Sequence, residues 1–94
     1  MRIGVPTEIK SNEYRVGLTP GSVRELATLG HAVCVQQGAG AGIGASDEVY
    51  RRAGASVLAS AAEVFAGADM IVKVKEPQPV EVAMLEPRHV LFTY

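Results

Sequence analysis

Arg15 is the first residue whose type and position suggest binding chemistry. It lies in the middle of a polar loop, residues 7–18, with Tyr14 and Val16 as its neighbours. The planar guanidinium of an arginine can give two parallel hydrogen bonds to a carboxylate, so Arg15 is a candidate ligand for an acidic substrate. The alternative is a surface arginine that pairs with Glu8 or Glu13 and contributes little.

Two lysines stand at the end of a run of β-branched residues. Lys73 and Lys75 alternate with Val72 and Val74, and the two-residue period of a strand predicts that both lysines lie on one face. Lys75 is closer to the end of that strand, which favours it as the ligand-contacting residue. The alternative is a pair of solvated lysines on an exposed sheet face.

A glycine-dense segment, residues 38–44, offers a third candidate. Gly40 to Ala45 matches G-x-G-x-x-A between a strand and a helix, a pattern through which a dinucleotide pyrophosphate can approach the backbone. The segment follows the second predicted strand instead of the first, however, and the third strand lacks the acidic residue that would hold a ribose hydroxyl. We interpret it as a turn-rich loop and keep dinucleotide binding as the alternative.

The remaining reactive side chains are predicted to be structural. Cys34 has no basic neighbour and alternates with valines, so we expect it to be buried. His31 follows Gly30 and suits a helix end or the surface, and His89 has no Asp, Glu or Cys at ligand spacing. Neither histidine is a catalytic or metal-ligand candidate, and we predict no metal site.

Strands and helices that alternate along the chain must position these residues. Pro20, after the capping residue Thr19, predicts a helix that ends at Gly30; Ser46 and Ser60 predict two further helix starts. The predicted strands cover residues 2–5, 31–36, 56–58, 70–74 and 90–94, and a last short helix covers residues 80–85.

Such alternation predicts an α/β fold, a Rossmann-like doubly wound and mostly parallel sheet with helices on both faces. Ligands in these sheets bind beyond the carboxyl ends of the strands. A strand order of 3-2-1-4 would bring the loops of Arg15 and Lys75 together. The last strand reaches Tyr94 without a turn, so we expect a sheet truncated after about five strands.

Size and charge limit the possible partners. A chain of 94 residues has room for one core, and its net charge of -1 without a basic patch argues against nucleic acid or an anionic membrane as partner. No apolar run approaches the roughly 20 residues of a spanning helix, and the start of the chain does not resemble a secretory signal. We therefore expect a cytoplasmic protein that binds a small molecule.

The order of several short segments resembles the alanine dehydrogenase and pyridine nucleotide transhydrogenase family, and alanine dehydrogenase in particular. The resemblance runs over the whole chain and is carried by MRIGVP at residues 1–6, by residues 8–20 around Arg15, by Gly30-His31, Gly38–Gly40 and Ala53–Ala55, and above all by VKVKEP at residues 72–77 and LFTY at residues 91–94.

This resemblance implies that residues 1–94 form part of an N-terminal substrate-binding domain, with the NAD-binding domain absent from the chain. It implies that Arg15 and Lys75 bind L-alanine or pyruvate and that Lys75 is also catalytic, in an NAD-dependent oxidative deamination of L-alanine to pyruvate and ammonia. The family's catalytic histidine and aspartate would lie outside these residues, and the complete enzyme would be a homohexamer. No residue of this chain is expected to bind NAD.

Two alternatives remain. One is the NAD-binding alpha subunit of a proton-translocating transhydrogenase, in which the residue at the position of Lys75 is typically not lysine. The other is a noncatalytic module that binds small carboxylates, which needs only Arg15 and Lys75.

Overall fold

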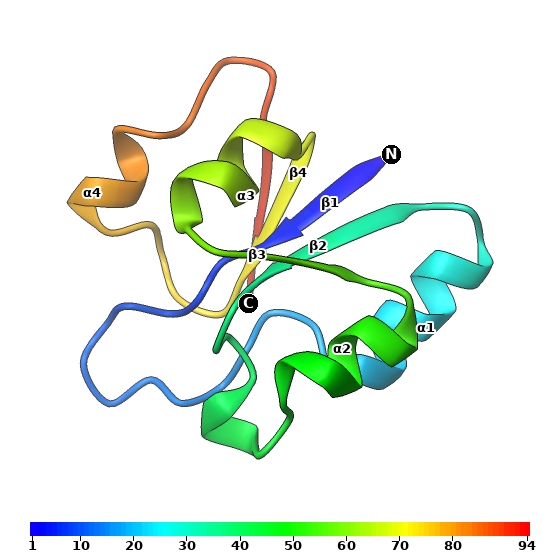
Figure 1. Cartoon of the computed structure of the whole chain (residues 1–94). Coiled ribbons are helices and arrows are strands. Elements are labelled where there is room, and N and C mark those ends of the chain that lie inside the picture. Colours follow the sequence, from blue (N-terminus) through cyan, green and yellow to red (C-terminus); the bar gives the residue numbers. More distant parts are fainter.

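Five short β-branched segments pair into one parallel sheet in the computed structural model, which describes residues 1–94 (Figure 1). The strand order is β3-β2-β1-β4-β5, which confirms the predicted 3-2-1-4 arrangement and adds β5 at the edge. The strands are β1 (Arg2–Val5), β2 (Ala32–Gln36), β3 (Ser56–Leu58), β4 (Met70–Lys73) and β5 (Val90–Thr93).

Hydroxyl side chains begin three of the helices, as predicted. The side chains of Thr19, Ser46 and Ser60 each accept a backbone N–H of the first turn, which satisfies one otherwise unpaired donor. Gly54 ends its helix with a φ of 110°, a conformation that costs a glycine little. The helices are α1 (Pro20–Thr28), the 3-10 turn η1 (Ala41–Ile43), α2 (Asp47–Ala53), α3 (Ala61–Gly67) and α4 (Pro79–Val82).

Helices cover both faces of the sheet, which confirms the doubly wound α/β prediction. Figure 1 shows α1 and α2 on one side of the strands and α3 and α4 on the other. Alternate strand residues supply the two cores: Val5, Val35 and Val72 belong to the larger one, together with Tyr50 of α2. Ile71 belongs to the smaller one, beneath α3. None of the helices combines the length and apolar character needed to cross a membrane.

The chain reverses direction across the sheet between β1 and β4. It runs outward from β1 through β2 to β3, then returns to the other side of β1 to form β4 and β5. Whereas β1 and β2 share four paired positions, β1 and β4 share only two, Ile3 with Met70 and Gly4 with Ile71. The carboxyl ends of β1 and β4 therefore meet at a topological switch point, where doubly wound sheets bind ligands.

Several element boundaries differ from prediction. β2 begins at Ala32, one residue later than expected. β4 ends at Lys73 instead of Val74, because the next two backbone N–H groups bond to a side chain. The last helix covers Pro79–Val82 instead of residues 80–85 and continues as a turn. β5 ends at Thr93, one residue earlier than expected.

Candidate functional site

The loop after β1 lies directly on the end of β4. A Cβ atom on Gly17 would come within 2.4 Å of the carbonyl oxygen of Val72, so only glycine permits this approach. The hydroxyl of Tyr94, just after β5, donates a hydrogen bond to the carbonyl of Gly17. Both contacts fix the loop over the switch point, although its residues are far from β4 and β5 in the sequence.

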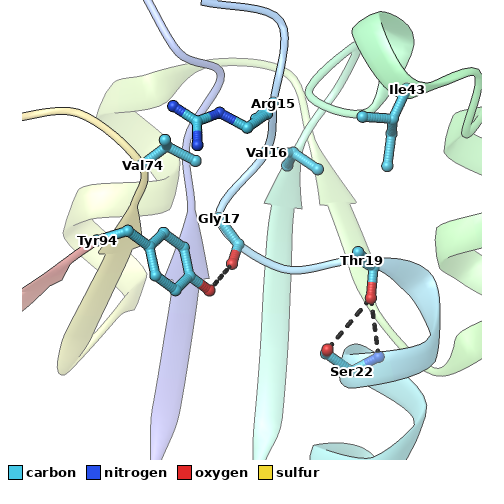
Figure 2. Close-up of a pocket in the computed structure, with 8 residues that line it drawn as sticks. All are labelled: Arg15, Val16, Gly17, Thr19, Ser22, Ile43, Val74 and Tyr94. Carbon is cyan, nitrogen blue, oxygen red and sulfur yellow. Dashed lines mark hydrogen bonds between the residues drawn. The ribbon is translucent and has the colours of Figure 1, made fainter.

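A cavity of about 300 Å³ opens beside this loop (Figure 2). The apolar part of its wall includes Val16 and Val74, and its polar groups come from the Arg15 loop, the start of α1 and the residue after β5. It is lined by Arg15, Val16, Gly17, Thr19, Ser22, Ile43, Val74 and Tyr94. An arginine at an otherwise largely uncharged wall favours a small anionic ligand.

Arg15 is held by Glu13. Its Nε and Nη2 atoms donate to the two carboxylate oxygens of Glu13, each at 3.0 Å, and its backbone N–H donates to the same carboxylate at 2.9 Å. The Glu13 side chain is only 5% exposed whereas that of Arg15 is 64% exposed. Arg15 therefore does pair with Glu13, as the alternative predicted. The two side chains are not equally exposed, however: the Glu13 carboxylate is buried, whereas the Arg15 guanidinium is exposed at the cavity.

This arrangement leaves one edge of the guanidinium unused. Glu13 takes the edge formed by Nε and Nη2, while an arginine has a second edge, formed by Nη1 and Nη2, that can also bind a carboxylate with two hydrogen bonds. Glu13 thus fixes the plane of the guanidinium without using up its donors. In Figure 2 the Arg15 side chain extends toward the part of the wall formed by Val74 and Tyr94.

Positive charge dominates around Glu13. Hydrogen bonds from the side chain and the backbone of Arg15 lower the pKa of Glu13 to about 2, and the charge of Lys75 contributes to the same shift. Glu13 in turn raises the pKa of Arg15, with a smaller contribution from Glu8. The charges of Arg15 and Lys75 therefore both lower the pKa of Glu13, and the loop after β1 that carries Arg15 also contacts the backbone of Lys75 through Glu8.

Lys75 lies beyond the end of β4 and is half-buried. Its backbone N–H donates to Oε1 of Glu8 at 3.1 Å, and the N–H of Val74 donates to Oε2 of the same carboxylate at 3.0 Å. Lys75 does not itself line the cavity, although Val74 does. Because β4 ends at Lys73, the two-residue strand period that predicted Lys73 and Lys75 on one face does not extend to Lys75.

Lys73 is buried, which excludes for this residue the alternative of a solvated lysine on an exposed sheet face. Only 1% of its side chain is exposed, and its Nζ lies 3.2 Å from Glu8 Oε1 and 3.1 Å from Glu81 Oε2. Both carboxylates are buried too, at 2% and 0% exposure. A signal existed: a central strand covered on both faces buries nearly every residue, so a lysine within it requires a buried partner.

The glycine-dense segment, residues 38–44, packs against other parts of the protein. A Cβ on Gly42 would come 2.1 Å from the carbonyl oxygen of Tyr14, and one on Gly40 would come 2.5 Å from both the carbonyl of Ala45 and the ring of Tyr50. The glycines therefore allow close packing against the Arg15 loop and α2. These contacts support the interpretation of the segment as a turn-rich loop.

The remaining candidates have structural contacts. His89 accepts the N–H of Glu86 at Nδ1, and its Nε2 lies 2.7 Å from the carbonyl oxygen of Phe65, so its ring connects the segment before β5 to α3. His31 lies near the amino group of Met1. Cys34 is half-buried instead of fully buried, and burial raises the pKa of its thiol.

Comparison with known proteins agrees with this geometry. The family model described as alanine dehydrogenase/PNT, N-terminal domain, matches residues 4–94. The chain is 50% identical to the alanine dehydrogenase of Methanococcus maripaludis and 51% identical to that of Bacillus subtilis, in each case over all 94 residues and 25% of the relative.

Two solved structures have the same fold. One, titled L-alanine dehydrogenase, superposes with a TM-score of 0.96 at 49% identity and covers 100% of this chain and 26% of its own. A transhydrogenase from Sinorhizobium meliloti gives 0.91 at 34% identity and covers 99% and 26%. The chain thus spans about a quarter of the length of these relatives, and it belongs to the alanine dehydrogenase/PNT N-terminal domain family.

Proposed function

We propose that this chain is the substrate-binding part of an NAD-dependent L-alanine dehydrogenase, and that Arg15 binds the carboxylate of L-alanine or pyruvate. The observation that carries the proposal is the guanidinium of Arg15, which Glu13 holds by one edge while the other edge remains available at the cavity. The likeness to alanine dehydrogenases over the whole chain supports the choice of substrate.

A substrate carboxylate would bind between two cations, Arg15 and Lys75. Glu13 occupies one edge of the Arg15 guanidinium and leaves its other edge for the substrate. Two cations that share an edge of a sheet repel each other, and an anion between them relieves that repulsion. The cavity volume of about 300 Å³ is ample for a three-carbon acid.

In this proposal Lys75 contacts the reacting centre. Its ammonium would donate to the carbonyl oxygen of pyruvate, or to the nitrogen of the imine, and stabilise the charge that develops there. We propose that this chain is part of a longer protein, here called the complete enzyme. The rest of that enzyme would bind NAD, which exchanges hydride with the α carbon of the substrate. The residues of this chain bind and orient the substrate.

The wider organisation follows from the same proposal. Residues 1–94 would form part of an N-terminal substrate-binding domain, and NAD would bind outside them. We expect the complete enzyme to be a cytoplasmic homohexamer, as in the resembled family. We expect neither nucleic acid nor a membrane as its partner.

Steady-state kinetics of the complete enzyme test these roles. Arg15→Lys keeps the charge and loses the bidentate edge, so KM for pyruvate should rise about tenfold or more while kcat changes less. Lys75→Ala should lower kcat and kcat/KM together, because the interaction strengthens in the transition state. Arg24→Lys on the exposed face of α1 is the matched control and should behave as wild type. Wild-type kcat for Lys75→Ala would refute the proposal.

A transhydrogenase is the second candidate, because the family includes both activities and the Sinorhizobium meliloti protein shares the fold. The two are separated by substrate. An alanine dehydrogenase oxidises NADH only when pyruvate and ammonia are present, whereas a transhydrogenase exchanges hydride between two nucleotides without either. Hydride exchange between nucleotides in the absence of pyruvate would favour the second candidate.

A further inference from the structure

Glu8 holds the backbone that carries Lys75. Its carboxylate accepts the N–H of Lys75 at 3.1 Å and that of Val74 at 3.0 Å, and it pairs with the Nζ of Lys73 at 3.2 Å. Three donors thus converge on one carboxylate that is 2% exposed. All come from the end of β4, whereas Glu8 belongs to the loop after β1.

The burial of this cluster requires an explanation. Lys73 carries one positive charge and Glu8 and Glu81 carry two negative ones, so the cluster has a net charge of -1 out of contact with water. Oε2 of Glu81 lies near Lys73 but lacks a hydrogen bond of good geometry. Buried ion pairs are weak contributors to stability, and an apolar cluster of similar volume is often as stable. Stability alone is therefore a poor account of three buried charges at this place.

We propose that Glu8 is a positioning residue for Lys75: its carboxylate fixes the backbone after β4 so that the ammonium of Lys75 reaches the substrate bound at Arg15. This inference rests on the function proposed above. Lys73 and Glu81 support Glu8 from beneath and do not contact substrate. The same carboxylate adds negative charge near Arg15 and so links the two substrate-binding residues.

Glu8→Gln disturbs this arrangement with little change in volume. A glutamine has one acceptor oxygen, so its amide must point its NH₂ group either at the N–H of Val74 or at the N–H of Lys75 and the ammonium of Lys73. One or other backbone donor then faces another donor and loses its partner. The backbone after Lys73 must shift, and Lys75 shifts with it.

Glu81→Gln is the matched control. Glu81 is also fully buried, also lies within reach of Lys73, and its other oxygen accepts the N–H of Gln78 at 2.9 Å. It has no hydrogen bond to Val74 or Lys75. Both variants therefore remove one buried carboxylate beside Lys73, but only Glu8→Gln disturbs the backbone that carries Lys75.

The experiment measures pyruvate reduction by the complete enzyme, well below the melting midpoints of the variants. Glu8→Gln should lower kcat/KM at least about tenfold, mostly through kcat, because a displacement near 1 Å of a polarising group has large kinetic effects. Glu81→Gln should remain within about twofold of wild type. In the Lys75→Ala background, Glu8→Gln should cause little further loss, because the two residues act as a unit.

Each outcome decides the inference. Equal kinetic effects of Glu8→Gln and Glu81→Gln, or a loss from Glu8→Gln that persists in full in the Lys75→Ala background, would overturn the positioning role and leave the proposed function intact. Wild-type kinetics of Lys75→Ala would overturn the function of Lys75 itself, and this inference with it. If Glu8→Gln does not fold, Glu8→Asp keeps the charge beside Lys73, but its shorter side chain cannot reach both amides and should give the same kinetic loss.

Discussion

Removal of the Lys73 ammonium tests how far the buried cluster depends on its one cation. Lys73→Met keeps an unbranched side chain of similar length and leaves the carboxylates of Glu8 and Glu81, 2% and 0% exposed, without a counter-charge. Breaking a buried ion pair on one side costs about 3–5 kcal/mol, because the remaining charge stays buried and unpaired. A domain of 94 residues has a total stability of roughly 5–14 kcal/mol. The substitution should therefore remove about a fifth of it or more.

Urea denaturation of the 94-residue chain, followed by far-UV circular dichroism, measures this loss. With a slope of about 1–2 kcal/mol per M for a domain of this size, the midpoint should fall by about 1.5 M or more. Lys10→Met is the matched control, because Lys10 is 45% exposed and pairs with Glu76 at the surface, where such pairs contribute about 0–1 kcal/mol.

A second variant distinguishes charge from packing. If the loss arises from an uncompensated buried charge, Lys73→Met combined with Glu81→Gln should be more stable than Lys73→Met alone, since only one buried carboxylate remains. A midpoint for Lys73→Met equal to that of Lys10→Met, or a double variant less stable than the single one, would refute the reasoning.

Three further predictions concern other parts of the structure. Burial raises the pKa of Tyr50 to about 12. Between about pH 10 and pH 12 the unfolded chain therefore loses a phenolic proton that the folded chain keeps, and the free energy of unfolding should fall by about 2 kcal/mol as the pH rises. In urea titrations at several pH values, Tyr50→Phe should abolish this part of the pH dependence. Gly42→Ala should destabilise the chain by about 1–3 kcal/mol in the same assay because its Cβ meets the carbonyl of Tyr14, whereas Gly21→Ala, with 3.9 Å of clearance in α1, should be neutral or stabilising. Incubated with NAD and L-alanine, the 94-residue chain alone should form no NADH above a no-protein control, because in the proposed function NAD binds outside these residues. Sustained NADH formation would show this to be wrong.

The features that were predictable from the sequence depend on local rules. The helix starts at Thr19, Ser46 and Ser60 follow from side-chain capping, and the parallel sheet follows from the alternation of strands and helices. The loops of Arg15 and Lys75 meet at one edge because the strand order is the one expected for such a fold.

The features that were not predictable depend on contacts between distant segments. Glu8 and Glu81 contact Lys73 from 65 and 8 positions away in the sequence, and no local pattern marks either glutamate as its buried partner. The two-residue period of a strand was applied as far as Lys75, but β4 ends at Lys73, and the next N–H groups bond to the carboxylate of Glu8 instead of a backbone carbonyl. The family resemblance identified Arg15 and Lys75 without indicating that Glu13 holds the guanidinium by one edge.

The opening of the site and the burial of Glu8 have a common cause in the topology. β1 and β4 pair at only two positions and then separate, because the chain turns in opposite directions on either side of the switch point. Separation makes room for a ligand beyond the strands, but it also leaves the N–H groups of Val74 and Lys75 without acceptors in the sheet. Buried N–H groups without acceptors are costly. A carboxylate from the loop after β1 supplies both acceptors at once, and its charge then requires a buried cation, which is Lys73.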